Sequence, residues 1–102
     1  MNNSEPPHSE LIKLLEYFKS EKYKEAEVLA LSITEKFPNH PFGWKVLGSI
    51  LRRVGRVSEA LIFNQKAIKL DPKDSNAHNN LGNNLNDLSR LTEAEECFRL
   101  AF

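Results

Sequence analysis

A repeat with a period of 34 residues constrains the fold of this chain more than any other feature of its sequence. One set of large apolar and small residues recurs at fixed offsets: Trp44, Leu47, Gly48, Leu51, Ala60 and Ala67 correspond to His78, Leu81, Gly82, Leu85, Ala94 and Ala101. A weaker copy precedes this set, with Tyr17, Ala26 and Pro38 at matching offsets. A fixed period of this length, with residues of these types, is typical of a helix-turn-helix repeat.

The spacing of apolar residues predicts six helices, at about residues 8–20, 23–37, 41–54, 58–70, 75–88 and 92–102. No stretch alternates apolar and polar residues as a strand would. The predicted loops are short, so successive helices must be antiparallel neighbours.

Residues that start or stop helices support these bounds. Pro38 cannot continue the second helix, and Pro41 is placed where a first-turn proline is tolerated. Gly55 is expected to end the third helix in a left-handed conformation, and Asp74 or Ser75 to cap the fifth. Thr92 with Glu95 three residues later predicts a capping box for the sixth helix.

Gly48 and Gly82 lie inside predicted helices, where glycine costs about 1 kcal/mol relative to alanine. Small residues, Ala60 and Ala94, recur on each following helix. We therefore expect each glycine to allow a close approach between two helices, with the matching alanine on the opposite side.

These motifs resemble the tetratricopeptide repeat (TPR) family over nearly the whole chain. The resemblance implies an all-α fold, with antiparallel helix pairs stacked as a short right-handed superhelical solenoid of about three units. We expect a disordered segment at residues 1–7 and a repeat domain at residues 8–102, with units at about 7–40, 41–74 and 75–102, the last incomplete. The first unit has Glu10 and Leu14 in place of Trp44 and Gly48, as a terminal unit would. The second has Asn64 where the family usually has an aromatic residue.

Composition excludes several classes of partner. The 14 basic and 14 acidic residues give no net charge, which argues against nucleic acid or anionic membrane as the main partner. No apolar run approaches the length of a membrane span, and the N-terminus lacks the features of a secretory signal. The single cysteine, Cys97, cannot form an internal disulfide, so we expect a cytoplasmic protein.

No catalytic or metal site is predicted. His8, His40 and His78 are far apart and show no metal-ligand spacing with Cys97. The sequence has no nucleophile elbow and no phosphate-binding glycine loop. We expect a protein that is not an enzyme and needs no cofactor, with Cys97 as a structural thiol.

An asparagine-rich helix provides the strongest candidate for a binding surface. Six asparagines lie between residues 76 and 86, although asparagine is a mediocre helix former. A solvated face of drifting composition is one interpretation, and a binding surface is the other. The preceding pair adds polar residues to a comparable surface, so the candidate peptide-binding residues are Lys45, Ser49, Arg52, Asn76, Asn79, Asn80, Asn83 and Asn86.

The run from Ala77 to Asn83 resembles repeats of protein O-linked N-acetylglucosamine transferases and related bacterial proteins. In that family a ladder of asparagines binds the backbone of the substrate peptide, and Asn80 falls on the ladder position. Repeats that bind chaperone C-termini instead use a clamp of lysine, arginine and asparagine. Leu11 and Leu15 stand where that clamp needs polar residues, which disfavours it here.

The leading functional hypothesis is a non-catalytic protein-protein interaction module that holds an extended peptide or partner segment in its concave groove. Two alternatives remain open. The chain could be the substrate-recruiting front of a larger glycosyltransferase, sulfotransferase or oxygenase, because its third unit is incomplete. It could also be a structural unit that self-associates through its C-terminal helix, where apolar residues from Leu91 to Phe102 lack a partner.

Overall fold

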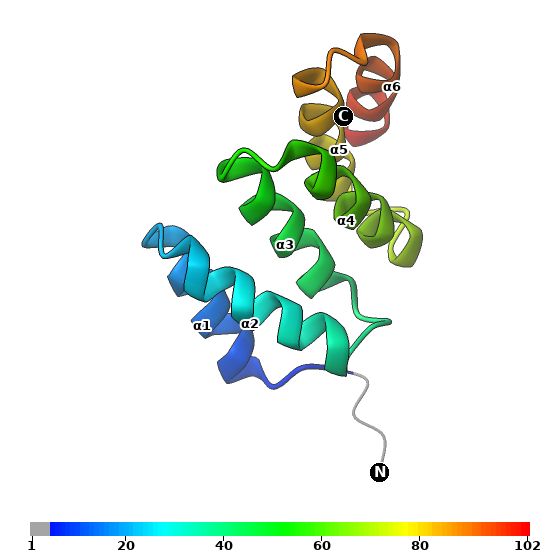
Figure 1. Cartoon of the computed structure of the whole chain (residues 1–102). Helices are drawn as coiled ribbons and strands as arrows, with labels where there is room; N and C mark the ends of the chain where they lie inside the picture. Colours follow the sequence, from blue (N-terminus) through cyan, green and yellow to red (C-terminus); the bar gives the residue numbers. More distant parts are fainter. Residues whose placement is uncertain (1–4) are drawn as a thin grey trace.

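The computed structural model describes residues 5–102, and within them it contains six helices and no strand: α1 (His8–Lys19), α2 (Tyr23–Lys36), α3 (Pro41–Arg53), α4 (Val57–Leu70), α5 (Ser75–Asp87) and α6 (Leu91–Ala101). Helices α1 and α2, α3 and α4, and α5 and α6 form pairs. The pairs are joined through α2 against α3 and α4 against α5, and they stack into an elongated body (Figure 1). The predicted all-α repeat solenoid is therefore confirmed.

The helix ends follow most of the sequence signals. His40 caps α3 by accepting a hydrogen bond from the Phe42 amide, and Asp74 caps α5 by accepting from two amides. The capping box predicted at Thr92 is wrong, because α6 begins one residue earlier and has no side-chain cap. Of the segment predicted to be disordered, residues 1–4 lie outside the described residues, while Pro6 is buried and Pro7 immediately precedes α1.

The turn inside each helix pair repeats with the same period as the sequence. Glu21, Gly55 and Ser89 each have positive φ, at 60°, 89° and 61°, and they are spaced 34 residues apart. In each turn the next residue's amide donates to a carbonyl five residues before it: Lys22 to Tyr17 at 2.9 Å, Arg56 to Leu51 at 2.8 Å and Arg90 to Leu85 at 2.8 Å. Gly55 was predicted to be left-handed, and the same geometry recurs where the residue is not glycine.

The core divides into two clusters along the stack. The larger one joins the first two pairs around buried residues that include Leu14, Ile33, Leu47 and Ile50. The smaller one holds α5 and α6 together around Leu85, Ala94 and Cys97. Each cluster is built from the small and apolar positions of the repeat.

The close approach at the two helical glycines is real, but its partners differ from those predicted. A Cβ on Gly48 would lie 2.3 Å from Asn64 Oδ1, and one on Gly82 would lie 2.6 Å from Phe98 Cε1. Ala60 and Ala94 are buried, one helical turn before these side chains. The glycines therefore make room for residues 64 and 98, which occupy equivalent positions.

Two buried amides connect the second and third pairs. Asn64 on α4 donates its Nδ2 to Asn84 Oδ1 on α5 over 2.7 Å, and Asn84 Nδ2 donates to the Val57 carbonyl over 3.4 Å. Both asparagines are 0% exposed. The junction between α4 and α5 is thus specified by hydrogen bonds as well as by apolar packing.

Candidate functional site

A groove runs along the side of the stack that α1, α3 and α5 share. Helices α3 and α5 contact each other directly there, although they belong to different pairs. Two cavities of about 330 and 230 Å³ lie on this side, and both include Phe18, Ser49 and Asn80 in their walls. We call these two adjoining cavities the groove. The larger cavity is also lined by Leu15, Phe42, Lys45, Val46 and Asn76, and the smaller one by Arg52, Arg53 and Asn83.

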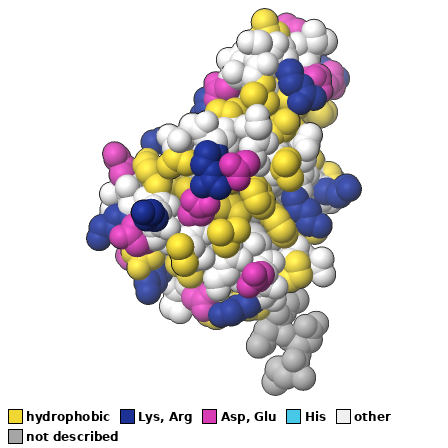
Figure 2. Space-filling view, in the orientation of Figure 1, with side chains coloured by type: hydrophobic (Ala, Val, Ile, Leu, Met, Phe, Trp, Pro, Cys, Tyr) yellow, Lys and Arg dark blue, Asp and Glu magenta, His cyan; other side chains and the backbone are white. Residues whose placement is uncertain are grey.

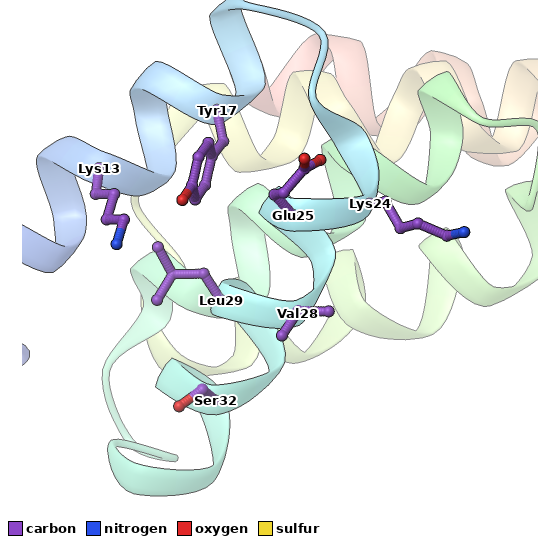
Figure 3. A pocket seen from close by; sticks show the side chains of 7 residues that line it. All are labelled: Lys13, Tyr17, Lys24, Glu25, Val28, Leu29 and Ser32. Atoms are coloured by element: carbon purple, nitrogen blue, oxygen red, sulfur yellow. The ribbon is translucent and has the colours of Figure 1, made fainter.

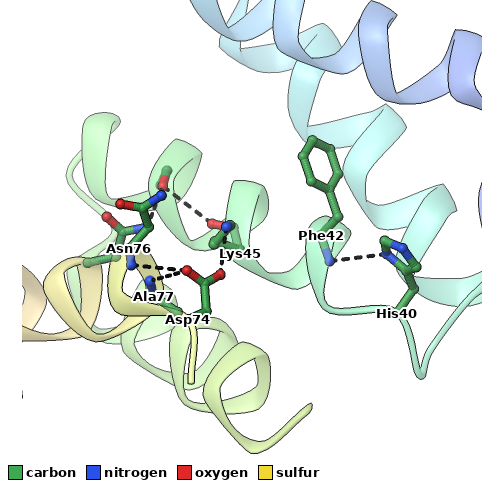
Figure 4. Close-up of polar contacts among 8 residues, drawn as sticks. His40, Phe42, Lys45, Asp74, Asn76 and Ala77 are labelled. Carbon is green, nitrogen blue, oxygen red and sulfur yellow. Dashed lines mark hydrogen bonds and ion pairs between the residues drawn. The ribbon is translucent and has the colours of Figure 1, made fainter. Parts of the chain in front are cut away.

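The ammonium group of Lys45 is held by Asp74 at the start of α5. Lys45 Nζ lies 2.7 Å from Asp74 Oδ2, while Asp74 Oδ1 accepts hydrogen bonds from the amides of Asn76 and Ala77 (Figure 4). Burial by itself would raise the pKa of Asp74, but the Lys45 contact and the two amides outweigh it and lower that pKa. The carboxylate therefore caps α5 and neutralises Lys45 at once.

Arg52 is neutralised in a similar way at the other end of α5. Its Nε and Nη2 atoms donate to the two carboxylate oxygens of Asp87 over 2.6 and 3.3 Å. A bidentate pair of this kind fixes the orientation of the guanidinium group. Charges of both signs are also mixed among hydrophobic side chains on the face seen in Figure 2.

The wall formed by α1 is held in place by an aromatic and cationic cluster. The guanidinium of Arg53 lies 5.6 Å from the Phe18 ring centroid and donates to the Tyr23 hydroxyl over 3.2 Å. Phe18 and Tyr23 meet edge to face at 5.8 Å. These contacts fix Phe18 at the point where the two cavities meet.

The amide and hydroxyl groups of the groove are partly linked to each other. Asn80 Nδ2 donates to Ser49 Oγ over 3.4 Å, and Ser49 Oγ donates to the Lys45 carbonyl over 3.3 Å. Both side chains are half-buried. Each Asn amide carries two N–H donors and an acceptor oxygen, so Asn80 keeps further hydrogen-bonding capacity.

The structure brings most of the candidate residues together. Six of the eight line the groove: Lys45, Ser49, Arg52, Asn76, Asn80 and Asn83. Asn79 and Asn86 line neither cavity. Sequence reasoning missed the apolar residues of the groove, Leu15, Phe18, Phe42 and Val46, and the two partners of its cations, Asp74 and Asp87.

A second hollow of about 540 Å³ lies between α1 and α2, away from the candidate residues. Figure 3 shows Lys13 and Tyr17 on α1 facing Leu29 and its neighbours on α2. Lys13 Nζ lies 5.8 Å from the Tyr17 ring centroid. No candidate residue from the sequence reaches this surface.

The surroundings of His78 and Cys97 favour structural roles for both side chains. His78 Nε2 lies 2.7 Å from the Pro72 carbonyl oxygen, and Trp44 Nε1 donates to the Pro38 carbonyl over 2.9 Å at the matching position of the previous repeat. Burial raises the pKa of the buried Cys97 thiol, and the charges of two nearby glutamates raise it further. A thiol with a raised pKa is a poor nucleophile at neutral pH.

Helix α6 leaves several large apolar side chains exposed. Leu91 and Leu100 on α6 are 59% and 55% exposed, and Phe102, directly after the helix, is 93% exposed, while Ala94 and Cys97 on α6 are buried. Across residues 5–102, none of the helices has the length and apolar character needed to cross a membrane.

Comparison with known proteins identifies a family for this sequence. Two family profiles, both described as tetratricopeptide repeat, match residues 44–74 and 63–96. Together they run from residue 44 to residue 96, just over half of the chain. A curated relative, protein O-mannosyl-transferase Tmtc3 of Drosophila melanogaster, is 36% identical over 52 residues, which is 51% of this chain and 6% of that protein.

Solved structures of the same shape cover nearly the whole chain. The second TPR of Spaghetti (RPAP3), bound to the HSP90 peptide SRMEEVD, has a TM-score of 0.87 at 22% identity, covering 91% of this chain and 86% of that one. MamA from AMB-1 has a TM-score of 0.81 at 26% identity, covering 90% of this chain and 50% of that one. At 22% identity, the similarity to the Spaghetti repeat concerns the fold alone.

Proposed function

The chain belongs to the tetratricopeptide repeat family, and from this premise we propose that it is a non-catalytic interaction module that holds an extended peptide or partner segment in its groove. The observation that carries this proposal is the pair of adjoining cavities formed by α1, α3 and α5. A concave site built from three separate helices can follow a chain segment several residues long.

The chemistry of the groove supports a peptide as the ligand. Asn80 and Ser49 offer neutral donors and acceptors, which can pair with a peptide backbone whatever its side chains. The complex of the Spaghetti repeat with an HSP90 peptide supports the same class of ligand, since that domain has the same fold. Cytoplasmic localisation remains part of this proposal.

A matched pair of asparagine variants tests the proposal. Asn80→Ala removes an amide that lines both cavities, whereas Asn79→Ala removes the same group from the neighbouring position, which lines neither. Peptides selected from an array on the wild-type protein should bind Asn80→Ala more weakly and Asn79→Ala normally, as measured by fluorescence polarisation. Equal affinity of all three proteins for every selected peptide would refute a groove function.

A second candidate function is favoured by the match to an O-mannosyl-transferase. The matched region spans only 6% of that protein, so its activity is carried over here as a proposal. In this version the module recruits protein substrates for a catalytic domain, such as a glycosyltransferase, sulfotransferase or oxygenase, encoded beyond codon 102. Reading the gene past that codon tests the idea, and a stop codon there would exclude it.

Self-association through α6 is also proposed, because Leu91 and Leu100 expose apolar surface on one helix. Burying a large apolar side chain contributes about 1.5–3 kcal/mol. Light scattering over a concentration series should show a dimer whose population falls in Leu100→Glu. A wild-type protein that stays monomeric at the highest concentration would contradict this part of the proposal.

A further inference from the structure

The cations of the groove are not free to attract an acidic ligand. Lys45 Nζ is 2.7 Å from Asp74, and Arg52 Nε is 2.6 Å from Asp87. The side chain of Asp74 is only 18% exposed, so its charge is poorly screened by solvent. An acidic segment in the groove would meet carboxylates already bound to the cations that it needs.

Displacing Asp74 from Lys45 would disturb more than one contact. The same carboxylate accepts the amides of Asn76 and Ala77 and thereby caps α5. Loss of a helix cap destabilises the helix that also carries Asn80 and Asn83. Arg53, the third cation of the groove, already lies over the Phe18 ring and donates to Tyr23.

The larger cavity offers apolar surface instead. Leu15 is 37% exposed, Phe18 and Phe42 are half-buried, and Val46 forms the floor at 7% exposure. Its volume of about 330 Å³ is at the low end of the range for ligand pockets, which is about 300–1,000 Å³. It is therefore suited to one large apolar side chain rather than to a larger ligand.

The amides of α5 border this apolar surface. Asn76 and Asn80 line the larger cavity together with Phe18 and Phe42, and Asn80 continues into the smaller one with Asn83. A backbone running along α5 can therefore exchange hydrogen bonds with amides while one of its side chains enters the apolar cavity. The two cavities of the groove thus offer different chemistry to one extended peptide: amides for its backbone and apolar surface for a side chain.

We propose that the groove selects an uncharged extended peptide that places one large apolar side chain against Leu15, Phe18 and Phe42, and that it discriminates against acidic segments. This inference rests on the proposed peptide-binding function and specifies the chemistry of the partner. The charge pairing at Lys45 and Arg52, together with the apolar floor, determines the choice.

A displayed library of random heptapeptides tests the proposed groove function and the proposed selectivity separately. Selection on the wild-type protein, followed by removal of sequences that also bind Asn80→Ala, isolates ligands of the groove. We expect enrichment of Leu, Ile, Met or Phe at one position and depletion of Asp and Glu. Recovered sequences rich in Asp and Glu would overturn this inference and leave the groove function intact. Recovery of no sequence that depends on Asn80 would refute the function itself.

Two matched pairs of variants test the mechanism with defined probes. Leu15→Ala should weaken binding of a selected apolar peptide at least threefold. Ile12 is 53% exposed on the same helix and lies outside both cavities, so Ile12→Ala should leave that binding unchanged.

Asp87→Asn frees Arg52 and should tighten binding of the acidic peptide SRMEEVD about two- to fivefold, an effect typical of an exposed charge pair. Glu95→Gln makes the same charge change outside the groove and should leave that affinity unchanged. Tight binding of SRMEEVD by the wild-type protein, or equal responses within either pair, would contradict the proposed selectivity.

Discussion

Replacing Gly48 with alanine should destabilise the protein, although alanine is the better helix former. A Cβ at this position would lie 2.3 Å from Asn64 Oδ1 and 2.6 Å from Asn64 Cγ. Contacts this short require a neighbour to move. The Asn64 side chain is 0% exposed and bonded to Asn84 over 2.7 Å, so it cannot move without breaking that hydrogen bond.

The magnitude follows from three contributions. Alanine in place of glycine stabilises a helix interior by about 1 kcal/mol. Overpacking a filled core costs about 1–3 kcal/mol. If the Asn64–Asn84 hydrogen bond breaks, a buried polar group loses its partner at a further cost of about 1–3 kcal/mol. The sum predicts that Gly48→Ala lowers the free energy of unfolding by about 1–5 kcal/mol.

Urea denaturation followed by circular dichroism measures this change, and a double variant identifies its cause. Asn64→Ala removes the atoms that the new methyl group would meet. In that background Gly48→Ala should no longer destabilise and should instead stabilise by about 1 kcal/mol, as expected from helix propensity alone. The reasoning is refuted if Gly48→Ala stabilises the otherwise unchanged protein, or if its cost is the same with and without Asn64.

Three further predictions concern the turns, an ion pair and the thiol. Glu21→Gly and Ser89→Gly should each raise the free energy of unfolding by up to about 1 kcal/mol, because both residues have positive φ; a loss of stability in urea titrations would contradict this. The pKa of Asp74 is lowered in the folded protein, so the ionised carboxylate contributes to folding stability above its ordinary pKa of 3.8. This contribution to stability is lost as the pH falls through the lower pKa of the folded state. Asp74→Asn should therefore be less stable than wild type at pH 7, and the difference should shrink in unfolding curves recorded below about pH 4. Cys97 should react slowly with a thiol reagent at pH 7 in the folded protein and quickly in urea, since its thiol is buried and its pKa is raised; equal rates would show that the thiol is accessible.

The fold could be predicted from the sequence because its signals recur. Pro38, Gly55 and Asp74 ended or began helices in the structure as they were expected to do. The close packing at Gly48 was predicted with the wrong partner. A repeated offset shows which positions are equivalent, but it does not show how far each helix is rotated toward its neighbour, and Ala60 and Asn64 lie on the same face one turn apart.

The candidate site was predictable only in part. The asparagines at positions 76, 79, 80, 83 and 86 lie at spacings of three and four, which predicts a single polar stripe on the helix. The groove is narrower than this stripe: Asn76, Asn80 and Asn83 line it, and Asn79 and Asn86 do not. The charge on Lys45 and Arg52 was visible in the sequence, whereas its neutralisation depends on residues 29 and 35 positions away. Those separations are close to the repeat period, so pairing charges between adjacent repeats would have been a usable signal.

The two buried amides at the α4–α5 junction link the shape of the solenoid to the proposed binding groove. Hydrogen bonds are directional, so the Asn64–Asn84 bond fixes the angle at which the third pair meets the second more narrowly than apolar contact would. The groove spans the same junction, with Ser49 and Arg52 on one side and Asn80 and Asn83 on the other. The junction therefore affects both the curvature of the solenoid and the shape of the groove. A substitution in the core at residue 64 or 84 should alter the groove without changing any of the side chains that line it.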